Sequence, residues 1–295
     1  MVVLTAVSAA LFAAILIPFK ILPIIPGVTE IRPANAIPMV MSLLFGPAGA
    51  WGSSFGNLVG DFFLGLGPGS VFGMIGNFLY GFAPYALWRT LFRDRMPDRA
   101  RAGDWVALMA IFLVAGSACA FTIGWGIDVV IGGVPFAILG SIIFFNNVVM
   151  SVILAPPLLF ALLPRVRAWG LLYTQILPEK AVRRPRFAWL GAILFTVGSV
   201  GGLGYGMAVA TGRYAQPVGI PQFWKALTKL AAPGTAAPPA SATALTGSVA
   251  RVPTGTAVAT PAPKPVAPPP APHRAGLGMA LAPMLVLIAL GVLLL

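Results

Sequence analysis

Few side chains in this 295-residue chain can do acid–base, metal or nucleophilic chemistry: seven acidic residues, one histidine and one cysteine. His273 lies in a Pro- and Ala-rich segment, which excludes a Ser–His–Asp site or a histidine metal cluster within the apolar segments. The lone Cys119 allows no internal disulfide, and no lysine follows a glycine, so the chain has no P-loop for ATP. We therefore predict that the chain is not an enzyme and that it holds no metal and no cofactor.

The most informative polar position is Asp61, at the end of an otherwise apolar segment. Ser53, Asn57 and Asp61 repeat every four residues and so share one face of a helix. Beside them runs a row of small residues that lets another helix approach closely: Gly52, Gly56 and Gly60. Two interpretations stay open. The polar row contacts neighbouring helices or the outer interface, or it binds a solute, because ionisable groups at membrane depth are costly.

Further amides and a tyrosine continue this pattern. Asn77 lies in a row of glycines spaced by four, Tyr80 follows it, and Asn146-Asn147 interrupts another apolar segment. Two adjacent amides need several hydrogen-bond partners, so at least one should face the interior of a helix bundle. For Asp128, at a predicted helix end, a cap at the membrane interface is the favoured interpretation.

A loop with opposite charges, residues 29–35, follows the first apolar segment. Either Glu30 and Arg32 form an exposed ion pair of little energetic value, or the loop is a lid whose side chains meet a polar solute. With the amides above, the candidate substrate-binding residues are Glu30, Arg32, Asn35, Asn57, Asp61, Asn77, Tyr80, Asn146 and Asn147.

The elements that position these residues are apolar helices. The chain is 58% hydrophobic and only 9% charged, whereas a soluble domain carries about 25% charged residues. Its apolar residues fall in long runs, as expected for a polytopic all-α membrane protein. The net charge of +12 comes without dense Lys/Arg tracts and interleaved aromatics, which argues against nucleic-acid binding and for a positive cytoplasmic face.

Eight membrane segments are predicted, the short second one tilted or partly submerged: residues 2–25, 36–45, 50–66, 71–91, 105–127, 134–163, 187–210 and 276–295. The first segment lacks the basic start of a signal peptide, so we expect it to remain as a membrane helix. Gly46-Pro47 is expected to form a turn, and Pro156-Pro157 to kink or end the sixth helix.

Charge in the short loops gives an orientation. Residues 93–104 and 165–186 are rich in arginine, whereas residues 65–69 and 128–133 carry no Lys or Arg. Alternating helices place both basic loops on one side, and the positive-inside rule makes that side cytoplasmic. We expect a multi-pass protein of the cell membrane with a cytoplasmic Met1 and with the loop at 29–35 facing outward.

The composition divides the chain into five parts. A membrane bundle (1–165) is followed by a basic segment (166–186), a further helix (187–210), a Pro/Ala-rich segment (211–275) and a last helix (276–295). From residue 233 onward the Pro/Ala-rich segment has almost no large apolar side chains, so it is predicted to be a disordered linker.

Small residues also recur in the first helix. Ala6 and Ala10 are four residues apart, as are Ala9 and Ala13. Such rows permit close contact with another helix. From spacing alone, packing within the bundle is favoured over contact with a partner protein.

Four stretches together resemble the substrate-binding S components of energy-coupling factor (ECF) transporters, most closely the queuosine-precursor branch. They are Glu30-Ile-Arg-Pro-Ala-Asn-Ala-Ile-Pro, Leu44-Phe-Gly-Pro-Ala-Gly-Ala-Trp-Gly, Gly56-Asn-Leu-Val-Gly-Asp-Phe-Phe and Phe72-Gly-Met-Ile-Gly-Asn-Phe-Leu-Tyr-Gly. The resemblance covers about residues 1–165. Residues 187–295 have no counterpart in a typical S component.

This resemblance implies a six-helix bundle with an outward substrate pocket closed by the loop after the first helix. It also implies that an alanine row on that helix docks a transmembrane coupling subunit, which two cytoplasmic ATPases drive. That row falls on Ala6 and Ala10, or on Ala9 and Ala13.

The favoured hypothesis is a substrate-capture subunit of an ATP-driven importer for a vitamin-like or nucleobase-like molecule. The first alternative is a membrane scaffold without a small-molecule ligand. The second is an intramembrane enzyme that uses Asp61 or Asp128 as an acid or base.

Overall fold

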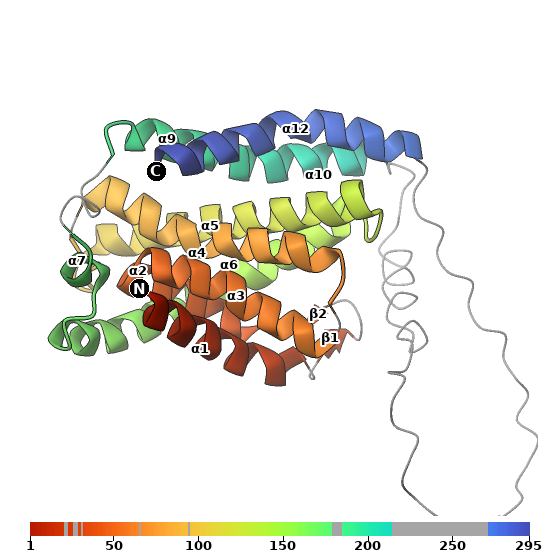
Figure 1. Ribbon diagram of the computed structural model, residues 1–295. Helices are drawn as coiled ribbons and strands as arrows, with labels where there is room; N and C mark the ends of the chain where they lie inside the picture. Colours follow the sequence, from red (N-terminus) through yellow and green to blue (C-terminus); the bar gives the residue numbers. More distant parts are fainter. Residues whose placement is uncertain are drawn as a thin grey trace, which may run out of the picture.

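The computed structural model describes residues 1–20, 23–25, 29–30, 32–64, 66–93, 95–178, 185–213 and 271–295 as a bundle of helices with one small hairpin (Figure 1). The α-helices are α1 (Val2–Lys20), α2 (Ala36–Phe45), α3 (Pro47–Leu64), α4 (Gly69–Phe92), α5 (Ala102–Trp125), α6 (Phe136–Ala168), α7 (Tyr173–Ile176), α9 (Ala188–Thr196), α10 (Gly202–Arg213) and α12 (Ala271–Leu294). A 3₁₀ turn, η1 (Pro33–Asn35), leads into α2, and a π-helical segment, η2 (Gly126–Ile131), extends α5. A second π-helical segment, η3 (Val197–Gly201), joins α9 to α10. Strands β1 (Pro23–Ile25) and β2 (Thr29–Glu30) pair antiparallel, with Pro23 opposite Glu30.

The predicted all-α class is confirmed. In the described part of the chain, four helices are long and apolar enough to cross a membrane by length and composition: Val2–Phe19, Ala102–Ile131, Phe136–Ile176 and Ala188–Thr211. The division into six helices plus two stays a prediction. So does the domain division, and most of its Pro/Ala-rich segment, residues 214–270, lies outside the described residues.

The structure differs from the predicted helices most clearly at three places. The first helix ends at Lys20 instead of continuing to residue 25, because the chain turns into β1 at Pro23. The last helix begins at Ala271, earlier than predicted. Pro156 and Pro157 do not end α6, which runs for 33 residues through both of them. Proline is tolerated in apolar helices where neighbouring groups satisfy the freed backbone carbonyls.

The glycine row on α3 packs against α1. An added Cβ on Gly52 would lie 2.3 Å from the Cβ of Ser8, and one on Gly56 would lie 2.8 Å from the carbonyl oxygen of Ala9. No side chain fits between these two backbones. Small residues therefore let α3 approach α1 closely, as the spacing predicts.

The short helix α2 lies inside the bundle. All ten of its residues are buried, and it contacts α3, α4 and α6. Gly46 ends α2 with a φ of 61°, as expected of a glycine at a turn. Enclosure by other helices explains why a segment too short to span a bilayer is stable there.

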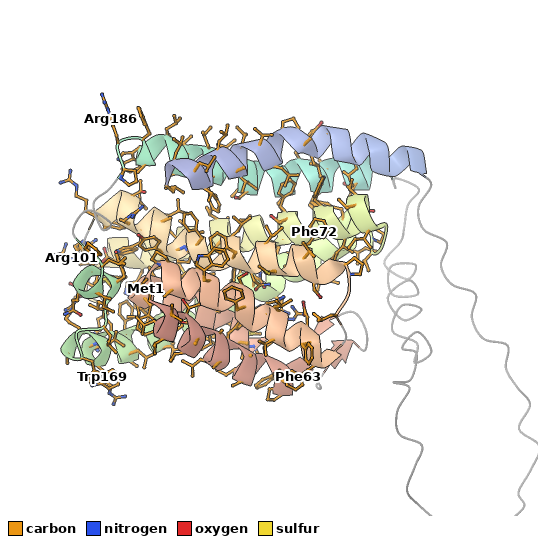
Figure 2. The ribbon with its side chains drawn as sticks, in the orientation of Figure 1. Met1, Phe63, Phe72, Arg101, Trp169 and Arg186 are labelled. Atoms are coloured by element: carbon orange, nitrogen blue, oxygen red, sulfur yellow. The ribbon has the colours of Figure 1, made fainter. Side chains whose placement is uncertain are left out.

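The described parts of the two basic loops lie at the same end of the bundle, as helix alternation predicts. Figure 2 shows Met1, Arg101, Trp169 and Arg186 gathered at this end, which we call the basic end. The β1–β2 hairpin lies at the opposite end (Figure 1).

Helices α9, α10 and α12 form a compact addition beside α5. An added Cβ on Gly291 of α12 would lie 2.6 Å from the backbone nitrogen of Phe195, and one on Gly198 would lie 2.9 Å from the backbone nitrogen of Ile288. Arg89 of α4 joins this addition to the bundle, because its guanidinium donates to the backbone oxygen of Leu295.

Candidate functional site

A cavity of about 330 Å³ lies near the hairpin end, between α3, α4, α5 with η2, and α6. This is the volume of a small-molecule site. Six of the nine predicted substrate-binding residues line it: Arg32, Asn57, Asp61, Asn77, Asn146 and Asn147. They come from four separate parts of the sequence.

The polar row of α3 faces this cavity from one side. The amide Nδ2 of Asn57 donates to Oδ2 of Asp61 at 3.1 Å. An added Cβ on Gly73 of α4 would lie only 2.9 Å from that Nδ2 and 3.4 Å from the Asp61 oxygen. The missing side chain at Gly73 thus makes room for the Asn57–Asp61 pair at the cavity wall.

Asn77 forms the next part of the polar wall. Its Nδ2 donates to the carbonyl oxygen of Gly73 at 2.9 Å, and Ser53 donates to the backbone oxygen of Asn77 at 2.8 Å. The second bond fixes α4 against α3. Within the described residues, the side-chain oxygen of Asn77 accepts no hydrogen bond, which leaves an acceptor for a ligand N–H.

Asn35 and Tyr80 lie behind the cavity wall and hold Asn147 in place. Asn35 Nδ2 donates to Oδ1 of Asn147 at 2.7 Å. The Tyr80 hydroxyl lies 3.1 Å from the backbone oxygens of both asparagines and 2.5 Å from the hydroxyl of Ser151. Tyr80 is fully buried and Asn35 is 3% exposed, so this network orients Asn147 without lining the cavity.

Asn147 faces the bundle interior, as predicted for at least one of the two adjacent amides. Asn146 is half-buried and its Oδ1 lies 3.4 Å from the backbone N–H of Arg32, which donates to it. This bond joins the residue that follows the hairpin to α6 at the cavity. The side chain of Glu30 lies outside the described residues.

Aliphatic side chains from α5, η2 and α6 line the rest of the cavity: Ile123, Ile127, Leu139, Ile142 and Ile143. The sequence does not distinguish them from lipid-facing residues, because both groups are apolar side chains on apolar helices. Ser70, in the first turn of α4, is a further lining residue that we did not predict. The cavity thus combines hydrogen-bonding groups with apolar surface.

Asp128 has a structural role at the start of α6. Its Oδ2 accepts the backbone N–H of Phe136 at 2.8 Å, at the first residue of α6, and the residue is fully buried. The predicted capping role fits this bond, and the predicted location at the membrane interface stays a prediction. Asp128 does not line the cavity.

The family model of QueT transporters matches residues 2–164, which is more than half of the chain. The chain belongs to the QueT transporter family. This is a family of queuosine precursor transporters, so the resemblance to the queuosine-precursor branch is confirmed. No match was found among curated proteins or among solved structures.

The QueT match contains every residue that lines the cavity, whereas α9, α10 and α12 lie beyond it. Membership of a transporter family implies a transport role and not catalysis. With its apolar helices, the QueT family member is a multi-pass membrane protein.

The predicted partner-docking alanines of this QueT family member divide between two faces of α1. Ala6 and Ala10 are exposed, Ala9 is half-buried beside Gly52 and Gly56, and Ala13 is only 4% exposed. An apolar groove of about 420 Å³ is open at the exposed side, lined by Met1, Val2, Thr5, Ala6, Ala9, Trp51 and Phe55. A helix could reach Ala6 and Ala10 from outside, but it could not reach Ala13.

Proposed function

We infer that this QueT family member is the substrate-capture subunit of an ECF-type importer and that its cavity binds a queuosine precursor base. The observation that carries this inference is the mixed lining of the cavity. Four amides and a carboxylate offer hydrogen bonds there, and five aliphatic side chains offer apolar surface.

A planar heterocyclic base suits such a cavity. Its edge carries N–H donors and carbonyl or ring-nitrogen acceptors, which pair with amide groups and with the Asp61 carboxylate. Its faces are apolar enough to lie against isoleucine side chains. A cavity of about 330 Å³ also has the size of a compact ring system with its immediate substituents.

The network behind the wall supports recognition of a defined shape. Asn147 is held by Asn35 and by the backbone contacts of Tyr80, so its amide does not have to be ordered when the ligand binds. Preorganised polar groups lose less entropy on binding and discriminate better between similar ligands.

Energy for import would come from partner proteins. The chain has no P-loop, and the exposed face of α1 offers Ala6 and Ala10 beside an apolar groove, where a transmembrane coupling subunit with two ATPases can dock. In the proposed orientation, Met1 and the basic end are cytoplasmic and the cavity opens toward the outer side.

Binding to purified protein tests the capture function. Isothermal titration and native mass spectrometry with a queuosine precursor should show one bound molecule per chain, with guanine and adenine binding more weakly. A protein that carries no small molecule and binds none of the three bases would instead be a membrane scaffold, the remaining alternative.

Co-purification tests the docking face. Ala6→Trp with Ala10→Trp should abolish association with the coupling subunit and leave precursor affinity unchanged, because both side chains point away from the cavity. The matched control is Val3→Trp, which changes another exposed residue of α1 outside the groove. If the double variant still associates with the coupling subunit, the docking face is not the exposed side of α1.

A further inference from the structure

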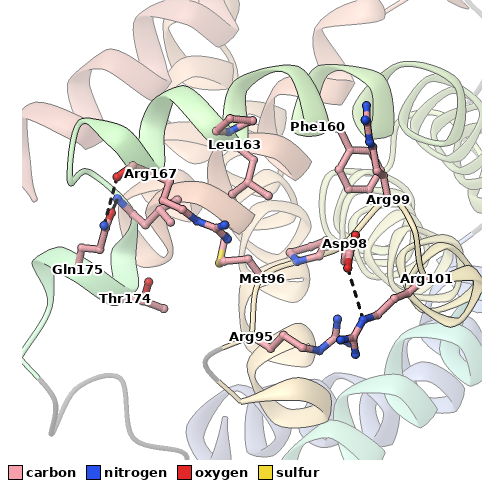
Figure 3. Close-up of a pocket in the computed structure, with 13 residues that line it drawn as sticks. Arg95, Met96, Asp98, Arg99, Arg101, Phe160, Leu163, Arg167, Thr174 and Gln175 are labelled. Carbon is pink, nitrogen blue, oxygen red and sulfur yellow. Dashed lines mark hydrogen bonds and ion pairs between the residues drawn. The ribbon is translucent and has the colours of Figure 1, made fainter.

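A second concave surface, which we call the arginine cleft, lies at the basic end of the bundle. It measures about 840 Å³ and lies between the α4–α5 loop, the end of α6 and the turn α7. Figure 3 shows Arg95, Arg99 and Arg101 extending from the loop, and Arg167 with Thr174 and Gln175 on the other side. None of the substrate-binding candidates lies here.

The loop that forms one side is held by tryptophans and by an aspartate. The indole N–H of Trp88 donates to the backbone oxygen of Arg95 at 2.6 Å, and that of Trp105 donates to the backbone oxygen of Arg99 at 2.9 Å. The carboxylate of Asp104 accepts the backbone N–H of Asp98 at 2.9 Å. These bonds define the loop, so the cleft is already formed without a ligand.

Two of the four arginines are paired internally. Arg95 forms a bidentate ion pair with Asp104, with 2.7 Å between Nη2 and Oδ1. The bond to this carboxylate also raises the pKa of Arg95. Arg101 lies 3.4 Å from Asp98.

Arg99 and Arg167 are exposed, and in the described part of the chain no ion pair or hydrogen bond engages their guanidinium groups. Asp98 in the cleft and Asp104 behind its loop are thus paired with the other two arginines. The cleft retains an excess of positive charge with donors suited to phosphate.

The surroundings of the cleft are those of a membrane interface. Trp105 and Trp169 are 38% and 66% exposed, and tryptophan favours the depth of lipid headgroups. Phe160, whose ring lies 5.2 Å from that of Trp105, forms part of the cleft floor.

An apolar track leads away from the cleft along α6. Phe145, Val149 and Ile153 are spaced by four residues and are 63%, 43% and 59% exposed. This row continues toward Phe160 and Pro164 at the cleft. A molecule with a phosphate and long apolar chains would match both features.

We propose that the arginine cleft binds the phosphate headgroup of an anionic glycerophospholipid, with Arg99 and Arg167 as its cationic contacts and the acyl chains along the exposed row of α6. The cytoplasmic leaflet supplies such lipids at the side where basic residues gather. This site is independent of the precursor cavity, and its test does not involve transport.

Native mass spectrometry of the detergent-purified chain tests the proposal with phosphatidylglycerol and phosphatidylcholine as probes. The chain should retain phosphatidylglycerol in preference to phosphatidylcholine. Arg99→Gln with Arg167→Gln should lower phosphatidylglycerol affinity by about 25-fold, at about fivefold for each arginine near a membrane surface. Both side chains are exposed, so the melting temperature without added lipid should not change.

The matched control is Arg165→Gln with Arg186→Gln, which removes the same charge from the same end of the molecule outside the cleft. An equal loss of affinity in both double variants would overturn the proposal, because it would show only a general effect of charge. Displacement of the lipid by an equal concentration of inorganic phosphate would point to a soluble phosphate ligand instead. Loss of coupling-subunit association with unchanged lipid affinity would make the cleft a protein interface and would equally overturn the proposal.

Discussion

The two ends of this QueT family member use different polar chemistry. The cavity at the hairpin end holds four asparagines, one arginine and one aspartate together with five aliphatic side chains. The cleft at the basic end holds four arginines, and its acidic partners are engaged within the loop. Amides in an enclosed space recognise the pattern of donors and acceptors of a neutral molecule, whereas arginines at an open surface recognise charge. The difference predicts that shape and hydrogen bonding control binding at one end, and ionic strength at the other.

The largest effect is expected from Asp61→Asn. The substitution keeps the shape of the side chain but replaces one acceptor oxygen by a donor, which would face a ligand N–H. Hydrogen bonds to charged groups contribute about 1.5–3 kcal/mol, so precursor affinity should fall by roughly 10- to 100-fold by titration. Asp98→Asn at the basic end is the matched control and should leave this affinity unchanged. Equal affinity in both variants would reduce Asp61 to a packing contact.

A smaller effect is expected from Gly73→Ala. The added methyl would lie 2.9 Å from Nδ2 of Asn57 and would push this amide into the cavity. We expect roughly a tenfold loss of precursor affinity, equivalent to about 1.4 kcal/mol, which is typical of a crowded site. Gly103→Ala is the control, because a methyl there meets no atom within 4 Å. Unchanged precursor binding by Gly73→Ala would show that Asn57 does not contact the ligand.

Substitution of two buried tyrosines distinguishes an effect on protein stability from an effect on precursor recognition. Tyr80→Phe removes the hydroxyl that contacts the backbone oxygens of Asn35 and Asn147, and Tyr85→Phe removes one that accepts from Arg89 at 2.7 Å. Each variant should lose about 1–2 kcal/mol of unfolding free energy in a denaturation experiment. Only Tyr80→Phe should also weaken precursor binding, by about fivefold, because only Tyr80 positions a cavity residue. Parallel losses of affinity would contradict this division of roles.

The smallest effect concerns salt. Raising the ionic strength from about 0.1 M to 1 M shortens the screening length from about 10 Å to about 3 Å. Phosphatidylglycerol binding at the exposed arginine cleft should weaken steadily across this range, whereas precursor binding in the amide-lined cavity should change by less than about twofold, because it depends on hydrogen bonds of a neutral molecule. Titrations of the same protein sample with each ligand provide the comparison. A common salt dependence would mean that the two ends do not differ in the way proposed.

Much of the architecture follows from the sequence. Helix periodicity placed Gly52 and Gly56 on one face of α3, and the structure confirms that α1 packs against this face. The same periodicity placed Asn57 and Asp61 on the neighbouring face, which lines the cavity. The glycine pattern is informative because backbone contact leaves no room for a side chain. The basic loops likewise predicted which segments share one end of the bundle.

The sequence was least informative where the same residue type serves two environments. Ile123 in the cavity wall and Ile153 on the exposed row are chemically equivalent, so neither spacing nor composition separates them. The boundary at Lys20 was also missed, because hydropathy continues through the β1 segment while Pro23 disfavours a helix.

The sequence by itself therefore determined that this protein lies in a membrane and that it is helical. It also determined that the basic loops cluster and which polar groups line most of the cavity. These properties depend on composition and on contacts within one helix, which local periodicity reports. Only the tertiary structure decided that Tyr80 and Asn35 lie behind Asn147 and that Asp128 caps α6 away from the cavity. It also decided that Arg99 and Arg167 have no acidic partner in the described part of the chain. Each of these depends on residues far apart in sequence, and their relative positions are set by how the helices pack.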